Sequence, residues 1–247
     1  MTVELSVVEG LPEIGAGDPL GELIATRADL RDGDVLAVAQ KVVSKAEGRR
    51  VRLAEVEPGE QASELAAVLG KDAALVEVIL SETRRIVRSE RVLIVETLSG
   101  LVCANAGVDS SNAGAGEGEV ILLPADPDAS ARRLRSELQA LSGTTLAVIV
   151  TDSFGRPWRR GQTEVAIGCA GMDPLDDWRG RTDRDGRELE ATEIAVADGI
   201  AAAADLVRDK VAGAPVVLVR GLGGRVTAAD GPGAAALRRD AADDLFR

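Results

Sequence analysis

The chain has 247 residues, of which 45% are apolar, a formal net charge of −12 at pH 7, and no His or Tyr. This length and apolar content allow a sizeable buried core, which excludes a disordered chain. The negative charge opposes nucleic-acid binding and requires any phosphate site to be locally basic or metal-loaded, while the absence of His excludes Ser-His-Asp and Cys-His mechanisms and His-ligated metals.

The first segment, residues 3 to 8, alternates like a strand and runs into the turn Gly10-Leu11-Pro12. Asp18-Pro19 then opens a helix, with Pro in the first turn, where no amide donor is missed. The N-terminus lacks a signal-peptide pattern, and no apolar run approaches the ~18 residues that cross a membrane. We therefore expect a cytoplasmic protein with no membrane partner.

Residues 35 to 43 are predicted to form a buried strand that delivers Ser44 and Lys45 to a loop before Gly48. A lysine at such a position resembles the phosphate-binding lysine of nucleotide sites, although the pattern G-x-x-x-x-G-K-[ST] is absent. Residues 61 to 81 are predicted to be helical.

Two apolar runs, 92 to 95 and 101 to 108, flank the turn Ser99-Gly100 and are predicted to be strands. The second run ends in the polar cluster Asp109-Ser110-Ser111-Asn112. Cys103 lies in this run, and because the other cysteine is distant in sequence and no zinc-ligand spacing exists, we expect both cysteines to be buried and free.

Asp126-Pro127 is predicted to cap a helix that Gly143 ends. The next run, 146 to 150, is predicted to be a buried strand that ends at the polar cluster Thr151-Asp152-Ser153. Four further elements are expected: strands at 164 to 170 and 215 to 220, a helix at 193 to 209, and a terminal helix at 234 to 246.

The two polar clusters, 109 to 112 and 151 to 153, offer carboxylates beside small polar side chains. Hard oxygen ligands of this type suit Mg²⁺ or Mn²⁺ that bridges phosphate oxygens. Asp and Asn at strand ends also commonly form turns, so spacing alone leaves the structural interpretation open.

Three arginines, Arg156, Arg159 and Arg160, crowd a glycine-flanked segment shortly after Asp152. In an acidic protein this is a candidate anion clamp. The alternative is a solvated loop whose arginines pair with surface carboxylates. The acidic run between residues 176 and 190 is interpreted as a solvated loop and strand edge.

Together these segments resemble the coenzyme F-420-0 γ-glutamyl ligase family over nearly the whole chain. The stretches that carry the resemblance are GLPEI (10 to 14), VVSKAEGR (42 to 49), NAGVDSSN (105 to 112), LLPADPDASA (122 to 131), VTDSFGRPWRRGQTEVAIG (150 to 168) and DGRELEATEIAVAD (185 to 198). The likeness extends to the N-terminal domain of actinobacterial two-domain versions.

The resemblance implies roles for individual residues. Asp109 and Asp152 would bind one divalent cation, and Ser153 would help to hold a second. Contacts with GTP are implied for Leu11, Pro12, Glu13, Ile14, Gln40, Lys41, Lys45 and Asn112. Lys45 would also neutralise phosphate charge during catalysis, and we expect Arg156 and its neighbouring arginines to receive the anionic precursor or the incoming glutamate.

The family implies an α+β fold, a single ligase domain over residues 1 to 247 with two intertwined lobes, largely antiparallel sheets and packed helices, and a homodimer. It also implies phosphoryl transfer from GTP to the carboxylate of coenzyme F-420-0, attack of L-glutamate on the acyl phosphate, and release of GDP and phosphate. Cofactors would be two Mn²⁺ or Mg²⁺ ions, with K⁺ as a further cation. Phosphoryl transfer depends on positioning and charge neutralisation, so it does not require His.

Two positions depart from the family pattern, namely Asp209-Lys210 after the Ala-rich helix and Gly199, where Glu is common. They leave the ligand set of the second cation open. Two other functions also stay open: a metal- and nucleotide-dependent carboxylate-amine ligase for a different acid, and a GTP- or F-420-binding module inactive without a partner domain.

Overall fold

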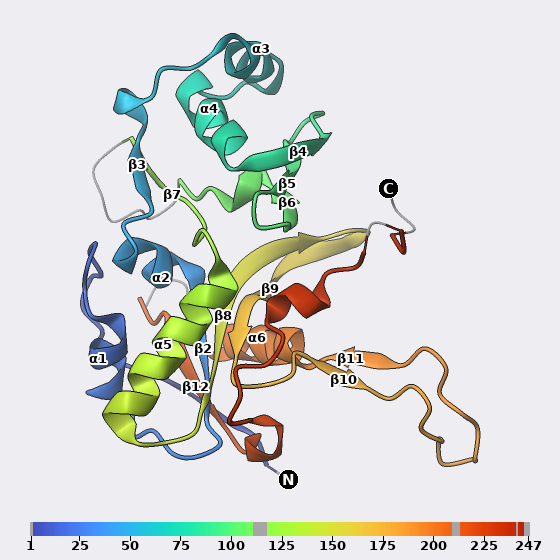
Figure 1. The fold of residues 1–247 in the computed structure, drawn as a ribbon. Coiled ribbons are helices and arrows are strands. Elements are labelled where there is room, and N and C mark those ends of the chain that lie inside the picture. The colour runs from blue at the N-terminus through green and yellow to red at the C-terminus, as the bar shows by residue number, and fades with distance from the viewer. Residues whose placement is uncertain (1, 111–117, 209–212, 241, 245–247) are drawn as a thin grey trace.

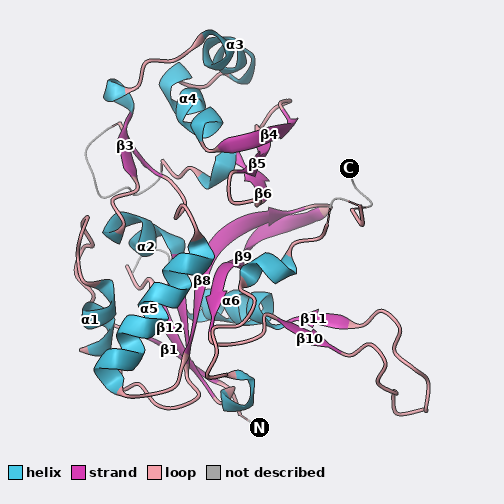
Figure 2. Ribbon diagram, in the orientation of Figure 1, coloured by secondary structure: helices cyan, strands magenta, loops and turns pink. Residues whose placement is uncertain are grey.

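The computed structural model describes residues 2–110, 118–208, 213–240 and 242–244 (Figure 1). Helices and mostly antiparallel sheets are interspersed along the chain, which confirms the predicted α+β class (Figure 2). None of the helices in these ranges has the length and apolar character needed to cross a membrane. Cys103 and Cys169 are buried and free, as predicted.

The core is a five-stranded sheet in the order β1-β12-β2-β8-β9. Its strands are β1 (Glu4–Val7), β12 (Val216–Arg220), β2 (Val35–Ala39), β8 (Ala147–Arg156) and β9 (Arg159–Ala170). Within the described residues β2 and β8 form the one parallel pair, and every other pairing is antiparallel. The carboxyl ends of β2 and β8 therefore meet at one edge of the sheet.

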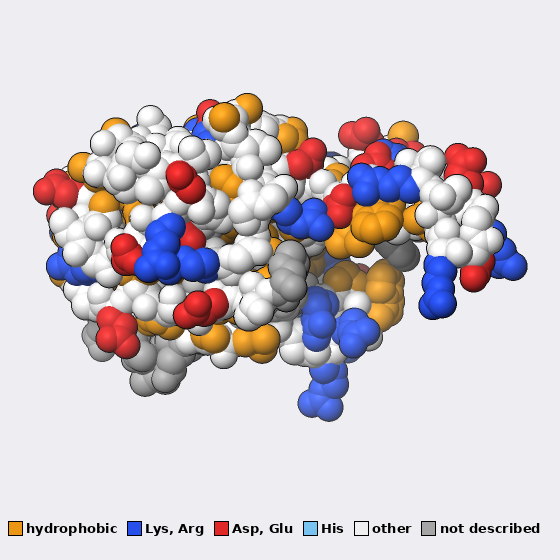
Figure 3. All heavy atoms as spheres, turned by 90° about the horizontal axis from the view of Figure 1, so that it is seen from below, with side chains coloured by type: hydrophobic (Ala, Val, Ile, Leu, Met, Phe, Trp, Pro, Cys, Tyr) orange, Lys and Arg blue, Asp and Glu red, His pale blue; other side chains and the backbone are white. Residues whose placement is uncertain are grey.

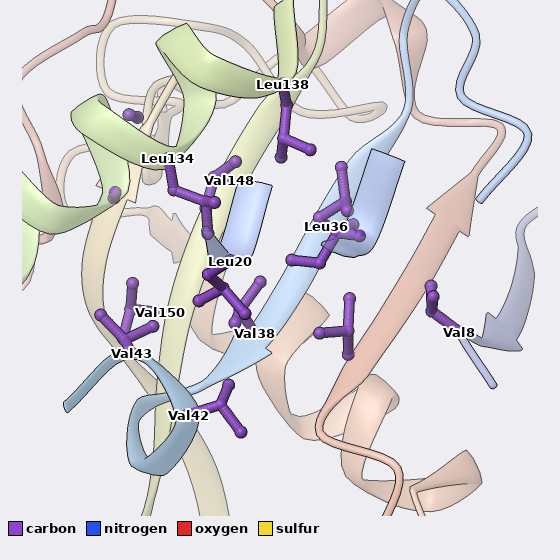
Figure 4. Close-up of a cluster of buried hydrophobic side chains, with 14 of the residues drawn as sticks. Val8, Leu20, Leu36, Val38, Val42, Val43, Leu134, Leu138, Val148 and Val150 are labelled. Atoms are coloured by element: carbon purple, nitrogen blue, oxygen red, sulfur yellow. The ribbon is translucent and has the colours of Figure 1, made fainter. Parts of the chain in front are cut away.

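Both faces of this sheet are covered, so its central strands are apolar on both sides. Leu36, Val38, Val148 and Val150 face the helices α1 (Leu20–Ala25), α2 (Gln40–Ala46) and α5 (Pro127–Ser142), and Figure 4 shows these side chains converging. The alternate residues of β2 and β8 pack against helix α6 (Val196–Val207) on the other face. Burying each such Val or Leu contributes roughly 1.5–3 kcal/mol.

Residues 50 to 110 and 118 to 121 form a small lobe beside the end of the sheet (Figure 1). Its elements are β3 (Arg50–Arg52), α3 (Glu60–Leu69), α4 (Ala73–Ser81), β4 (Thr83–Arg88), β5 (Ile94–Thr97), β6 (Val102–Ala104) and β7 (Glu119–Ile121). β4, β5 and β6 form one antiparallel sheet, and β3 pairs with β7. The ion pair between Arg49 and Glu82 (2.7 Å) joins this lobe to the core.

A hairpin arm, β10 (Leu175–Asp177) and β11 (Glu193–Ala195), projects from the body (Figure 1). Acidic and basic side chains are interspersed on the face of the body and arm seen from below (Figure 3). Asp183 near the tip of the arm accepts hydrogen bonds from two backbone amides of its own loop. The prediction of a solvated loop and strand edge is confirmed for the exposed Asp185 and Glu188, whereas Asp176 is only 15% exposed and pairs with Arg225 at 3.0 Å.

The C-terminal segment is fastened to α5 by two buried charged side chains. Asp128 accepts hydrogen bonds from the backbone amides of Cys169, Ala234 and Ala235 at 2.6–3.1 Å. Arg135 donates to Leu146 O and pairs with Asp230 at 2.7 Å. The C-terminal segment is therefore held against β9 and does not extend into solvent.

The predicted strand at 35 to 43 is wrong beyond Ala39, because helix α2 begins at the next residue. Ser44 and Lys45 consequently lie on a buried helix and not in a loop. The cause is that Val42 and Val43 pack into the core from the helix, and a short buried helix has the same apolar run as a strand.

Other boundaries are corrected for similar reasons. The helix at 61 to 81 is broken by Gly70 in a left-handed conformation and by Asp72, whose side chain caps α4. Strand β8 continues through residues 151 to 153 to Arg156, because it pairs with β9 over its whole length.

Three predicted elements are shorter than expected. The run at 101 to 108 is a strand only to Ala104, and the helix predicted at 193 to 209 begins as strand β11. Of the helix predicted at 234 to 246, the described residues contain one short 3₁₀ turn, Ala234–Leu237. Asp128 holds the amides that begin this turn. Strand β4 was not predicted.

Candidate functional site

The edge of the sheet where β2 and β8 end in parallel gathers several of the predicted site residues. Ala39 on β2 pairs with Thr151 on β8, and the chain turns directly from Ala39 into α2. Ligands commonly bind outside the carboxyl ends of parallel strands. Gln40 is buried here and accepts a hydrogen bond from Ser44 at 3.0 Å, which fixes the first turn of α2.

Lys45 on α2 forms an ion pair with Glu13 in the loop that joins β1 to α1. The lysine side chain is only 6% exposed, whereas Glu13 is 66% exposed. Arg50 donates to the carbonyl of Ile14 at 3.0 Å and lies 3.8 Å from the Glu13 carboxylate. Two cations from α2 and β3 thus hold the 11 to 14 loop against α2.

Asp109 reaches this edge from the small lobe. It follows a turn in which Asn105, Ala106 and Gly107 all have positive φ (52°, 54° and 69°). The left-handed conformation is strained for a residue such as Ala106, and a Cβ at Gly107 would lie 2.6 Å from Leu123. The turn therefore requires glycine at its last position.

The Asp109 backbone is fixed by two hydrogen bonds of 2.9 Å to Ile121. Its carboxylate pairs with the Lys41 ammonium at 2.7 Å, with both side chains about one-quarter exposed. Two residues predicted from the family resemblance, on different lobes, are therefore in direct contact.

Asp152 lies on β8, half-buried, one residue beyond the end of the parallel pairing. Burial raises the pKa of this carboxyl to about 7, and the negative charges of Glu164 and Asp109 act in the same direction. The Lys41 ammonium acts weakly against them. Asp109 and Asp152 are thus close enough to repel each other, which costs free energy whenever both are ionised.

Ser153 and Asp152 neighbour a buried ion pair. The Ser153 hydroxyl donates to Glu164 at 2.7 Å, and Glu164 accepts from Arg208 at 2.9 Å. Glu164 and Arg208 were not among the predicted site residues. A single carboxylate within strand β9 gives no local signal, because its partner lies 44 residues away in sequence.

The cluster Arg156, Arg159 and Arg160 lies at the tip of the β8–β9 hairpin, and all three side chains are exposed. Arg156 donates to the carbonyls of Arg160 (2.8 Å) and Gly161 (3.3 Å) and so closes the tip. Arg156 is four positions beyond Asp152 on the strand, roughly 13 Å along it. The arginines are thus set apart from the two aspartates.

The donors at this edge fit a hard divalent cation. Two carboxylates and a hydroxyl are oxygen ligands, and a cation near both carboxylates would favour the ionised form of Asp152, which burial and the charges of Glu164 and Asp109 disfavour. Over the described ranges no group of three or more His, Cys, Asp or Glu side chains is arranged to hold a metal. Phosphate oxygens and water would have to complete the coordination, which is the usual pattern for Mg²⁺.

Two surface hollows lie outside this edge. A shallow groove of about 490 Å³ runs along β3 and β7, and a hollow of about 130 Å³ lies between the lobes beside Arg49 and Glu82. Neither is lined by Asp109 or Asp152, so we locate the candidate site by its chemistry. The predicted ligand Asn112 and the departure at Asp209-Lys210 lie outside the described residues.

Comparison with known proteins shows the family to which the chain belongs. Residues 10–221 match the family described as F420-0:Gamma-glutamyl ligase. Relatives named Coenzyme F420:L-glutamate ligase are 48% identical in Archaeoglobus fulgidus (90% of this chain, 89% of the relative), 49% in Methanopyrus kandleri (95% and 94%) and 44% in Methanothermobacter thermautotrophicus (100% of both). The match covers the 11 to 14 loop, α2, Asp109 and Asp152, and the chain belongs to the F420-0:γ-glutamyl ligase family.

Proposed function

We propose that this protein adds L-glutamate through a γ-linkage to coenzyme F-420-0 in coenzyme F-420 biosynthesis, with GTP as the co-substrate. The precursor's carboxylate takes the γ-phosphoryl group of GTP, and GDP leaves. The amine of glutamate then attacks the acyl phosphate, the amide forms and phosphate is released. The observation that carries this proposal is the meeting of Asp109, Lys41 and Asp152 at one sheet edge in a chain 44–49% identical to such ligases.

The charges at this edge support phosphoryl transfer. Lys41 and Lys45 are two of only four lysines in the chain, and both lie on α2. Lys45 is held nearly buried by Glu13, so its ammonium has little freedom to lose when it binds a phosphate. The residues 11 to 14, Gln40 and Asn112 would complete the contacts with GTP.

Two Mn²⁺ or Mg²⁺ ions would neutralise the phosphate charge, with K⁺ as a further cation. Asp109 and Asp152 would hold one divalent ion between the lobes, and Ser153 would contribute to the second. Because Asp109 belongs to the small lobe and Asp152 to the core sheet, ligand binding would join the two lobes. Lys41, which contacts Asp109, and Lys45 would bind the same phosphates.

Arg156, with Arg159 and Arg160, would receive the anionic precursor or glutamate. The hairpin carries these exposed guanidinium groups about 13 Å beyond Asp152, so the bound acid would extend away from the cations. We further propose a homodimer, in which the projecting β8–β9 hairpin and the β10–β11 arm are available for contact. Light scattering of the purified protein measures this directly: a monomer mass at micromolar concentration would exclude the dimer.

The function is tested by incubating the purified protein with coenzyme F-420-0, L-glutamate, GTP and Mn²⁺ while product mass and GDP are followed together. We expect a gain of one or more glutamate masses with matching GDP, lost in Asp109→Ala and in Asp152→Ala. Nucleotide hydrolysis with an intact precursor would indicate a ligase for another acid. Binding of GTP without turnover would indicate a nucleotide-binding module.

A further inference from the structure

A buried ion pair lies directly behind Ser153. Glu164 on β9 is the register partner of Ser153 on β8, so their side chains leave the same face of the hairpin. One carboxylate oxygen of Glu164 accepts from the Ser153 hydroxyl at 2.7 Å, and the other accepts from Arg208 at 2.9 Å. The side chains of Glu164 and Arg208 are each only 7% exposed.

Arg208 is fixed from several directions. It lies at the carboxyl end of α6, where a cation interacts favourably with the helix dipole. It also donates to the Thr151 hydroxyl and to the carbonyl of Ala37, both at 3.1 Å. The guanidinium thus ties together α6, β2, β8 and β9 at the carboxyl end of the parallel strands.

This arrangement controls the orientation of the Ser153 hydroxyl. A serine hydroxyl has one proton, and here it is directed toward Glu164, so its lone pairs are turned to other sides. A hydroxyl binds a cation through a lone pair. The group that accepts the hydrogen bond from such a hydroxyl fixes the direction of its lone pairs. Glu164 can accept hydrogen bonds from the Ser153 hydroxyl and from Arg208 at the same time, because a carboxylate has two acceptor oxygens.

We propose that Glu164 and Arg208 are positioning residues, with Glu164 orienting the Ser153 hydroxyl toward a divalent cation and Arg208 holding Glu164. This inference rests on the metal-dependent function proposed above. Burial of the pair gives it a second consequence, because a charge left without its partner in this position destabilises the fold. The test must therefore separate metal binding from stability.

The informative variant is Glu164→Gln. Ser153 and Arg208 donate to different oxygens of the Glu164 carboxylate, and an amide has only one oxygen, so at this position one of the two donors would meet an N–H group instead of an acceptor. With its oxygen on Arg208, the amide N–H meets the Ser153 oxygen, and the hydroxyl proton turns toward the cation. Side-chain size is nearly unchanged, so the variant tests orientation more than packing.

Mn²⁺ binding to the full chain is measured by the electron paramagnetic resonance signal of free Mn²⁺, with a non-hydrolysable β,γ-imido GTP analogue present. For Glu164→Gln we expect the weaker Mn²⁺ site to lose about 10- to 100-fold in affinity, the effect typical of groups that orient metal ligands. The site that Asp109 and Asp152 would form should be the tighter one, because it has two carboxylate ligands, and it should stay within about threefold of wild type.

Ser153→Ala should produce the same loss, and combining it with Glu164→Gln should add nothing further, because Glu164 acts through Ser153. The matched control is Asp34→Asn, which removes a buried carboxylate paired with Arg220 (2.8 Å) at the opposite end of β2. That variant should lower the melting temperature and leave both Mn²⁺ affinities unchanged. If Glu164→Gln does not fold, Arg208→Lys is measured in its place. This variant keeps the positive charge but loses the several N–H donors of the guanidinium, and it should weaken Mn²⁺ binding at the second site.

The outcomes separate the two claims. If wild type binds two Mn²⁺ ions and Glu164→Gln or Arg208→Lys binds both as tightly, the inference is overturned while the proposed function stands. Additive losses in the double variant overturn it as well. If wild type binds fewer than two ions, the proposed metal set is wrong and the inference falls with it.

Discussion

Replacing Asp152 by Asn should stabilise the metal-free protein, and increasingly so as the pH rises. The Asp152 pKa is raised from 3.8 to about 7 in the folded protein, first by burial and then by the charge of Glu164. When the pKa of a carboxyl is higher in the folded than in the unfolded protein, its contribution to stability is fully present below the pKa of the unfolded state. That contribution is lost as the pH rises through the pKa of the folded state. Ionised Asp152 therefore opposes folding at pH 8, and Asn carries no such cost.

The magnitude follows from the two pKa values. Relative to a neutral side chain, the linkage relation predicts that Asp152 lowers the free energy of unfolding by about 4 kcal/mol at pH 8 and by about 2 kcal/mol at pH 5.5. Because solvent reaches the half-buried carboxylate, we expect Asp152→Asn to gain about 1–2 kcal/mol more at pH 8 than at pH 5.5. Urea unfolding of both proteins at these two pH values, with a chelator present, measures this difference.

Mn²⁺ provides the complementary measurement. Excess Mn²⁺ should stabilise the wild-type protein at pH 8 and have a much smaller effect on Asp152→Asn, because the cation binds the ionised carboxylate. An equal free energy of unfolding for the two proteins at pH 8, or a gain that does not depend on pH, would show that Asp152 is not held in a repulsive environment.

Three further outcomes follow from individual contacts. Lys45→Ala should weaken GTP binding about 10- to 100-fold in equilibrium titration, as expected for a lost charge-assisted contact, while Lys71→Ala in the small lobe should not. Asp128→Ala should lower the free energy of unfolding in urea by about 3 kcal/mol because three backbone amides lose their acceptor; an unchanged midpoint would contradict this. Gly168→Ala should cost about 1–3 kcal/mol in the same assay, since its Cβ would lie 2.1 Å from Pro127 O, and wild-type stability would refute that packing argument.

The sequence predicts best those elements whose ends carry their own signals. Helix α5 is capped at its N-terminus by Asp126, whose side chain accepts a hydrogen bond from Ala129 N at 2.9 Å, and at its C-terminus by Gly143 in the left-handed conformation. Both features are local and were predicted. Helix α2 lacks a side-chain cap, and its valines continue the apolar run of β2, so periodicity over seven residues could not separate it from the strand.

The site shows the same division between local and distant information. Asp109 and Asp152 each occur in a recognisable polar cluster, yet they are 43 positions apart in sequence, and only the family resemblance assigned them to one site. The Glu164–Arg208 pair has no counterpart in any local pattern, because a buried ion pair depends on the packing of α6 against the sheet. Such residues become visible only when the burial and geometry of both partners are known.

The central claim, that GTP activates the precursor's carboxylate by phosphorylation, is tested most directly by labelling that carboxylate with ¹⁸O. In one turnover with GTP, Mn²⁺ and L-glutamate, we expect one labelled oxygen in the released phosphate for each amide formed, with both products absent in Asp152→Ala. Amide formation with label in GMP, or with unlabelled phosphate, would contradict the acyl-phosphate mechanism.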